Sequence, residues 1–128
     1  MNTLSTAAEV LGFWRGAGPD RWFARSVAFD DLFRARCLDA HLAAARRELD
    51  HWMDRAEGAL ALMVLLDQFP RNCFRGTAHM FATDALALRL ARDALERGFD
   101  REVEPALRLF FYLPFDHSEN QLRHKGIG

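Results

Sequence analysis

The chain has 128 residues, enough for one domain with a hydrophobic core but too few for two. Its 17 lysines and arginines against 18 aspartates and glutamates leave a net charge of −1, which argues against a nucleic-acid or anionic-membrane surface. The longest apolar run, residues 59–66, is too short to span a membrane, and the N-terminus lacks the basic and apolar regions of a signal peptide. We therefore expect a soluble, cytoplasmic protein.

Apolar residues recur every three or four positions along the chain, which predicts an all-α fold of about five helices. Thr6 and Glu9 have the spacing of a capping box, so a first helix begins there and ends in the Gly-Ala-Gly segment 16–18. Ser26 is a favoured N-cap residue and opens a second helix. The segment RRELDHW, residues 46–52, closes that helix.

The third predicted helix is the most apolar part of the chain. Asp54 and Glu57 resemble the cap pair of its first turn. Its body, residues 59–66, is apolar on every side, which predicts a central buried helix. Pro70 is expected to end it, because proline lacks a backbone donor and disfavours helix in the residue before it.

Two further helices are predicted after this point. Thr83 or Asp84 caps the fourth, which stops at Gly98. Pro105 fits the first turn of the fifth, and Pro114 is expected to stop it.

The end of the chain is polar and contains glycine, so we expect a helical domain over residues 1–120 and a disordered tail over 121–128. Cys37 and Cys73 are far apart and form no CxxC motif, which predicts reduced thiols in or near the core. The spacing of the histidines and cysteines does not favour a metal site, and no cofactor motif is present.

The stretch LLDQFPRNCFRGTAHMFATD, residues 65–84, concentrates most of the reactive side chains. As a functional site, its two arginines and the backbone donors of a helix terminus can form an anion pocket. Asp67 or His79 can act as a base, and the segment DHSE, residues 116–119, can add a second acid–base group. As a structural corner, the same stretch supplies Arg71 to bond helix-end carbonyls, Arg71 or Arg75 to hold Asp67 in a partly buried pair, and several turn and cap residues.

Two segments resemble the bacterial family known as domain of unknown function 924: LLDQFPRNCFRGTAHMFATDALAL, residues 65–88, and FFYLPFDHSEN, residues 110–120. VLGFWRG and RWFARSVAFDDLFRARC fit the opening of the same family, so the resemblance runs from about residue 8 to residue 120. It implies an all-helical, tetratricopeptide-like array of antiparallel helix pairs, and it implies no assigned activity.

Members of this family continue past the His-Ser-Glu motif with further helices, whereas this chain stops soon afterwards, which suggests a shortened C-terminus. We expect this to leave the apolar face around Phe110, Phe111 and Phe115 uncovered. Uncovered aromatic surface favours self-association, so the sequence predicts a homodimer through the C-terminal helix.

The sequence favours a non-enzymatic helical binding module that recognises a peptide or a small anionic ligand near the Arg71/Arg75 corner, by analogy with other helical arrays. The predicted ligand-binding residues are Arg71, Asn72, Arg75, His79, Asp84, Tyr112 and His117. The alternative is a small-molecule hydrolase or transferase. Its predicted acid–base residues are Asp67, His117 and Glu119.

Overall fold

The computed structural model describes residues 3–124, and describes side chains up to residue 121. Within these residues the chain forms helices and no strands, which confirms the all-α prediction. In chain order, the elements are α1 (Ala7–Ala17), α2 (Pro19–Trp22), α3 (Val27–Ala45), η1 (Asp50–Asp54), α4 (Ala56–Met63), η2 (Val64–Gln68), α5 (Phe69–Cys73), η3 (Ala78–Phe81), α6 (Asp84–Glu96), η4 (Phe99–Glu102), η5 (Pro105–Leu107) and α7 (Leu109–His124).

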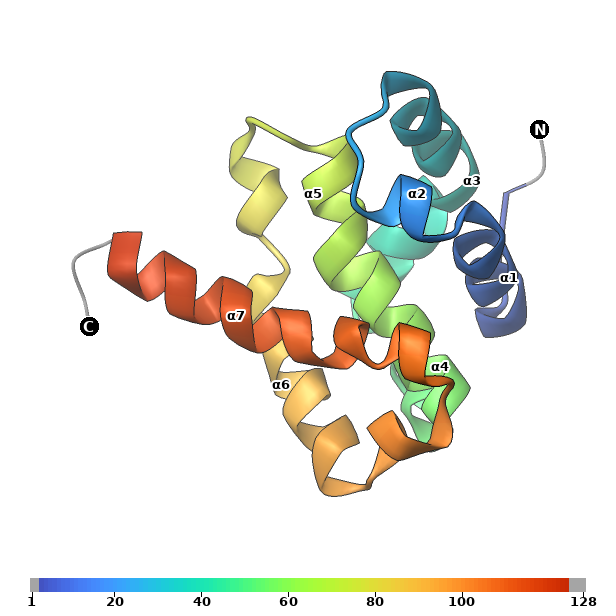
Figure 1. Ribbon diagram of the computed structural model, residues 1–128, viewed down its shortest axis with the longest axis vertical. Coiled ribbons are helices and arrows are strands. Elements are labelled where there is room, and N and C mark those ends of the chain that lie inside the picture. Colours follow the sequence, from blue (N-terminus) through green and yellow to red (C-terminus); the bar gives the residue numbers. More distant parts are fainter. Residues whose placement is uncertain (1–2, 125–128) are drawn as a thin grey trace.

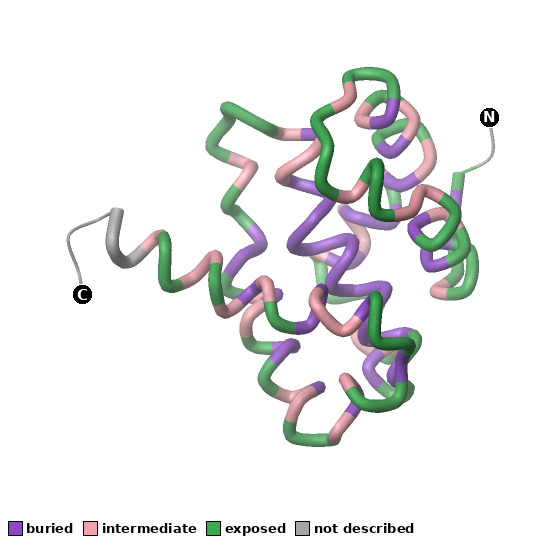
Figure 2. The backbone as a smooth tube through the Cα atoms, viewed as in Figure 1, coloured by how far each residue is buried: buried purple, intermediate pink, exposed green. Residues whose placement is uncertain are grey.

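One long helix runs through the centre of the molecule and consists of α4, the π-helical segment η2 and α5 without interruption (Figure 1). Every residue from 58 to 70 is buried, which confirms the predicted central helix (Figure 2). Helix α1 packs on α4, α3 packs on α5 and η2, and α6 and α7 pack on each other and on the central helix. This element order is compatible with a tetratricopeptide-like array, which stays a prediction.

Two of the predicted helix starts have the expected cap. Thr6 accepts a hydrogen bond from the Glu9 backbone N–H while the Glu9 carboxylate accepts one from the Thr6 backbone, a complete capping box. Ser26 caps α3 by accepting from the backbone N–H of Phe29. The predicted cap pair of the central helix is wrong, because Arg55 is the N-cap and makes no side-chain cap hydrogen bond.

The expectation that Pro70 ends the central helix is wrong, because the helix continues to Cys73. In a regular α-helix the Pro70 ring would clash with the carbonyl of residue 66. The chain avoids this by widening into the π-helical segment η2, where the N–H of Phe69 bonds the carbonyl of Val64, five residues back. The proline therefore shapes the helix locally and does not end it.

The expectation that Pro114 stops the last helix is also wrong. Pro114 is buried inside α7, which continues to His124. Packing of α7 against α6 and the central helix offsets the cost of proline in a helix interior, about 3 kcal/mol. Residues 121–124, which we expected in a disordered tail, are therefore helical, and residues 125–128 lie outside the described part of the chain.

The aromatic core joins the first and last helices. Trp14, Phe110 and Phe111 are fully buried, and the Trp14 ring meets Phe110 edge to face at 5.3 Å between centroids. The expectation that Phe110 and Phe111 are uncovered is therefore wrong, and the homodimer prediction loses that support. Burial also raises the pKa of the free thiols Cys37 and Cys73 to about 12, so both behave as core residues.

Candidate functional site

The π-helical segment leaves two backbone carbonyls without their usual helical donors. Leu66 would normally be bonded by the N–H of residue 70, which proline lacks, and Leu65 by the N–H of Phe69, which bonds Val64 instead. Side chains from two other helices supply the missing donors. The Thr83 hydroxyl donates to the Leu66 carbonyl at 2.7 Å, and His41 Nδ1 donates to the Leu65 carbonyl at 2.8 Å. The local widening thus fixes α3 and the start of α6 to the central helix.

A buried polar cluster, which we call the inner cluster, lies immediately after this segment. It comprises Asp67, Gln68, Arg71, Asp84, His117 and Gln121 from the central helix, α6 and α7. The Asp67 side chain is only 1% exposed, and its carboxylate accepts from His117 Nδ1 at 2.8 Å and from Gln68 Nε2 at 2.9 Å. A carboxylate buried this deeply requires such partners.

Arg71 is the centre of the inner cluster. Its guanidinium binds Asp84 in a bidentate arrangement at 2.8 and 2.9 Å, and it also reaches the Asp67 carboxylate at 3.3 Å. Gln121 from α7 donates to the same Asp84 carboxylate. One guanidinium is therefore shared between two buried carboxylates, and this arrangement ties three helices together.

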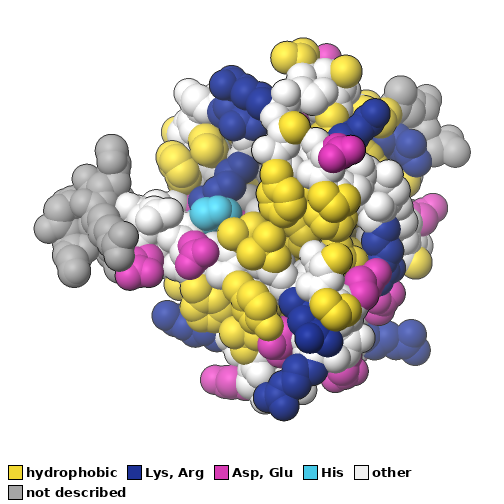
Figure 3. Space-filling model, viewed as in Figure 1, with side chains coloured by type: hydrophobic (Ala, Val, Ile, Leu, Met, Phe, Trp, Pro, Cys, Tyr) yellow, Lys and Arg dark blue, Asp and Glu magenta, His cyan; other side chains and the backbone are white. Residues whose placement is uncertain are grey.

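The hydrogen bond between His117 and Asp67 fixes the state of the histidine ring. Because a carboxylate oxygen only accepts, His117 Nδ1 carries the hydrogen, and Nε2 is the atom left for other partners. The His117 side chain is 20% exposed, so this end of the cluster reaches the surface. Figure 3 shows a histidine over α7 beside a cationic side chain over α5 and a hydrophobic patch.

His79 does not belong to the inner cluster but forms a pair with His41. Its Nε2 is 2.9 Å from Nε2 of His41, and its ring packs 4.2 Å from the ring of Phe74 between centroids. His41 is fully buried, and its burial lowers its pKa, because the charged form loses its hydration. The pair connects the short helix η3 to α3 and to the π-helical segment.

An open pocket, which we call the arginine pocket, lies next to the inner cluster and shares Arg71 with it. Its volume is about 220 Å³, and it is lined by Trp22, Phe23, Ala24, Arg25, Gln68, Arg71, Asn72 and Arg75. Arg25 and Arg75 are exposed, and neither has a carboxylate partner among the described residues. Asn72 donates to the Asp30 carboxylate at 2.8 Å, which fixes the pocket wall to α3.

The structure thus divides the predicted site residues into groups. The inner cluster brings together four of them, Asp67, Arg71, Asp84 and His117. The arginine pocket is lined by Asn72 and Arg75, and Arg71 lines it as well. The remaining three predicted residues lie elsewhere. His79 pairs with His41, the Tyr112 hydroxyl donates to Asp100 at 2.7 Å, and Glu119 is exposed on α7.

Several residues of these sites were not predicted from the sequence. Gln121 lies one helical turn after His117, and the sequence would have indicated it had α7 been expected to continue through Pro114. Trp22, Phe23 and Arg25 come from the segment before α3 and carry no motif. Only the fold brings that segment against the central helix.

The described part of the chain contains neither a cluster of metal ligands nor a membrane-spanning helix. No group of three or more His, Cys, Asp or Glu side chains there is arranged to hold a metal ion. Among these same residues, no helix has both the length and the apolar character needed to cross a membrane.

The fold and these sites define an all-α protein with a buried ionic cluster beside an arginine-lined pocket. The chain belongs to the family described as bacterial protein of unknown function (DUF924), whose model matches residues 10–127. It is similar to the solved structure of the protein of unknown function ATU0120 from Agrobacterium tumefaciens, with 62% sequence identity and a TM-score of 0.86. The match covers 87% of this chain and 63% of that one, so the chain spans less than two thirds of that relative. No curated protein matches it.

Proposed function

We propose that this protein is a binding module that recognises an oxyanion, a carboxylate or phosphate group, in the arginine pocket. The observation that carries the proposal is the presence of two unpaired arginines, Arg25 and Arg75, on one small pocket. The oxyanion can belong to a free small molecule or to a peptide, because the chemistry that binds it is the same.

Charge is the first argument for this function. The Arg71 guanidinium pairs with Asp84, whereas Arg25 and Arg75 form no ion pair among the described residues, although Asp30 and Asp31 line the adjoining hollow that both arginines also border. Two guanidinium groups without an ion-pair partner therefore border the pocket, and the Asp30 carboxylate beside it is already engaged by Asn72. Guanidinium groups bind carboxylate and phosphate oxygens in pairs, which gives both affinity and orientation.

The size and walls of the pocket are the second argument. A volume of about 220 Å³ is below the usual range for drug-sized ligands, so it suits the charged group of a ligand and little more. Gln68 and Asn72 add amide groups beside the arginines. Trp22 and the 64% exposed Phe23 form an apolar wall against which the rest of the ligand can pack.

The test is a titration followed by NMR with inorganic phosphate, citrate and a short phosphoserine peptide as three separate probes. We expect saturable shifts in the backbone signals around Arg75 with at least one probe. Arg75→Gln should weaken that binding by roughly tenfold or more, since a hydrogen bond to a charged group contributes about 1.5–3 kcal/mol. The matched control is Arg89→Gln, which removes an exposed arginine of α6 outside the pocket lining.

The outcomes separate the sources of the oxyanion. Binding of phosphate or citrate alone indicates a small-molecule ligand, and binding of the peptide alone indicates a peptide. If all three probes give no saturable shift, or if Arg89→Gln weakens binding as much as Arg75→Gln, the proposal fails.

We also propose a homodimer through the C-terminal helix. Phe115 and Leu113 of α7 are half-buried, and they provide what remains of the apolar face that the dimer would use. Sedimentation at tens of micromolar protein tests it, and a monomer at that concentration excludes the dimer.

A second candidate function is acid–base catalysis, which the 2.8 Å contact between Asp67 and His117 favours. A buried carboxylate that accepts from Nδ1 orients the imidazole and leaves Nε2 to accept a proton, an arrangement used by hydrolases. In this candidate Asp67 is a positioning residue, because its side chain is enclosed, and His117 is the base that removes a proton from an attacking water.

Hydrolysis of p-nitrophenyl acetate and p-nitrophenyl phosphate tests this candidate. General acid–base catalysis contributes typically 10²–10⁴-fold, so His117→Gln should reduce kcat/KM by about 10²-fold or more while the inner cluster keeps its fold. If the wild-type protein hydrolyses neither ester above the buffer rate, or if His117→Gln is as active as wild type, the catalytic candidate fails and the binding function is unaffected.

A further inference from the structure

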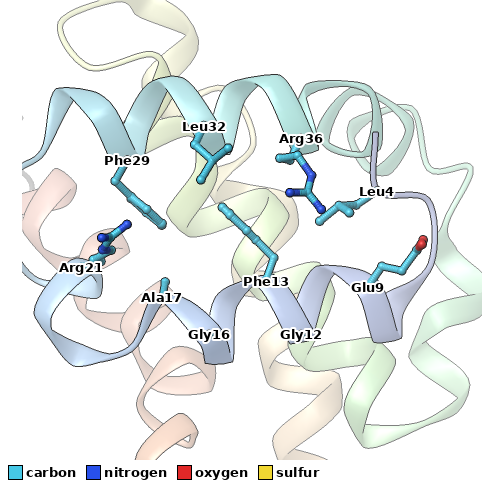
Figure 4. A pocket seen from close by; sticks show the side chains of 10 residues that line it. All are labelled: Leu4, Glu9, Gly12, Phe13, Gly16, Ala17, Arg21, Phe29, Leu32 and Arg36. Atoms are coloured by element: carbon cyan, nitrogen blue, oxygen red, sulfur yellow. The ribbon is translucent and has the colours of Figure 1, made fainter. Parts of the chain in front are cut away.

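A second cavity, separate from the arginine pocket, lies between α1 and α3. Its volume is about 490 Å³, and it is lined by Leu4, Glu9, Gly12, Phe13, Gly16, Ala17, Arg21, Phe29, Leu32 and Arg36 (Figure 4). It shares no lining residue with the arginine pocket. We call it the α1–α3 groove.

The wall that α1 contributes is open because two of its residues are glycines. A Cβ atom built on either Gly12 or Gly16 would meet no atom within 4 Å, so these positions border empty space. Phe13 from α1 and Phe29 and Leu32 from α3 are directed into the groove and give it an apolar lining between the two helices (Figure 4). Such surfaces favour contact with hydrocarbon.

The charged groups of the groove are mostly cationic, and the Arg36 guanidinium carbon lies 5.8 Å from the centroid of the Phe13 ring. Glu9 is the acidic residue of the lining, and its carboxylate is used by the capping box of α1. Arg21 and Arg36 have no carboxylate partner among the described residues. Arg36 Nε is buried without any hydrogen-bond acceptor, which is uncommon for a buried donor and requires an explanation.

We propose that the α1–α3 groove binds an amphipathic monocarboxylate with a hydrocarbon chain of medium length. The chain would lie along Phe13, Phe29 and Leu32, and the carboxylate would pair with the Arg36 guanidinium. This pairing gives the unsatisfied Arg36 Nε an acceptor, because a guanidinium can use Nε and one Nη on the same carboxylate after a small side-chain rotation. Arg21 adds a second positive charge at the other end of the groove (Figure 4).

The dimensions of the groove favour a small molecule over a helical peptide. A volume of about 490 Å³ lies within the usual range of ligand pockets. A helix is about 10 Å wide, so the same volume would accommodate only about one turn of it. A flexible chain of about eight carbons fits this space and needs no further surface.

The experiment is calorimetric titration of the full chain with octanoate, with 1-octanol and octylamine as neutral and cationic probes of equal chain length. We expect octanoate to bind saturably and more tightly than either of the other two. Arg36→Gln should weaken octanoate binding by about tenfold and leave octanol binding unchanged, because only the contact with the charged group is lost.

A matched pair of variants tests where the ligand binds. Gly12→Leu places a side chain in the open groove without a clash at its Cβ, and leucine is a better helix former than glycine, so the fold should be retained. It should abolish octanoate binding. The matched control is Ala35→Leu, which adds the same side chain at an exposed position of α3 outside the groove lining, and it should bind as wild type does.

Three results would overturn the proposal. Equal affinity for octanoate and octanol would show that no carboxylate is recognised. Unchanged binding in Gly12→Leu would place the ligand elsewhere. Absence of octanoate binding, together with a dimer in sedimentation that Gly12→Leu dissociates, would assign the groove to a second copy of the chain.

Discussion

Arg71 and Arg75 lie four residues apart in the same motif, and their surroundings are opposite. Arg71 is 16% exposed and shared between the carboxylates of Asp67 and Asp84, in contacts that join the central helix to α6. Arg75 is exposed in the turn that follows α5, and it has no carboxylate partner among the described residues. Arg71 is bound within the inner cluster, and Arg75 is the arginine that we propose contacts a ligand.

Two arginines of the same motif therefore differ in what they contribute because one is mostly buried and the other is exposed. Removing one partner of a buried ion pair leaves a buried charge without compensation, whereas an exposed charge is already solvated. The motif of residues 65–84 therefore contains both the structural corner and the candidate site, in adjacent turns of the same segment.

The largest expected effect comes from Arg71→Met, which breaks the inner cluster. It leaves Asp67 and Asp84 as buried carboxylates without their cation, so the free energy of unfolding should fall by about 3–5 kcal/mol. Urea denaturation measures this loss. Adding Asp67→Asn and Asp84→Asn to the same chain should restore part of it, because the uncompensated charges are then removed. A loss below about 1 kcal/mol in the single variant would contradict the structural role.

The next effect concerns the carbonyls freed by the π-helical segment. Thr83→Val keeps the shape of the side chain and removes the donor to the Leu66 carbonyl, which should cost about 1–3 kcal/mol. Pro70→Ala supplies a backbone N–H near the same carbonyl, so Thr83→Val should cost less in that background. A double-mutant cycle by urea denaturation measures the coupling, and fully additive effects would show that the two residues act independently.

A smaller effect is expected from pH through the histidine pair. Burial lowers the pKa of His41 in the folded protein, so the unfolded chain takes up this proton at a higher pH than the folded one. Its contribution to stability is complete above pH 6.5 or so and is lost as pH falls below that value toward the folded pKa, with a slope of at most about 1.4 kcal/mol per pH unit.

Urea denaturation at a series of pH values from about 7.5 to about 5 measures how the free energy of unfolding changes with pH. His41→Asn keeps a donor toward the Leu65 carbonyl and removes the titrating ring, so its slope should be flatter than that of wild type. His51→Gln, at an exposed histidine, is the control and should leave the slope unchanged. A His41→Asn slope equal to wild type would contradict the account.

The smallest effect on stability is expected at the arginine pocket. Arg75→Gln should change the free energy of unfolding by no more than about 0.5 kcal/mol, as is usual for exposed positions without partners. A loss of several kcal/mol would move Arg75 into the structural part of the motif.

Much of the fold could be predicted from the sequence, because it depends on local patterns. The capping box at Thr6, the cap at Ser26 and the apolar central helix are each determined within a few neighbouring residues. The two errors of helix length have a common cause. Pro70 and Pro114 each disfavour helix locally, and only the packing of the whole domain offsets that cost.

The candidate site could be predicted in part. The residues around Arg71 lie in one motif, so their proximity could be expected, and His117 was expected to join if the next corner lay alongside. Which arginine is buried could not be predicted, since this depends on where α6 and α7 pack. Arg25 could not be predicted at all, because it reaches the pocket from a distant segment.

The most direct test of the division between Arg71 and Arg75 is urea denaturation of wild type and Arg75→Gln, each with and without saturating concentrations of the oxyanion probe that binds. We expect the two proteins to be equally stable without the probe, and only wild type to gain about 2.7 kcal/mol at a probe concentration of a hundred times the Kd. An Arg75→Gln protein that is markedly less stable without the probe, or that gains as much as wild type with it, would contradict the claim that Arg75 serves a ligand and Arg71 serves the fold.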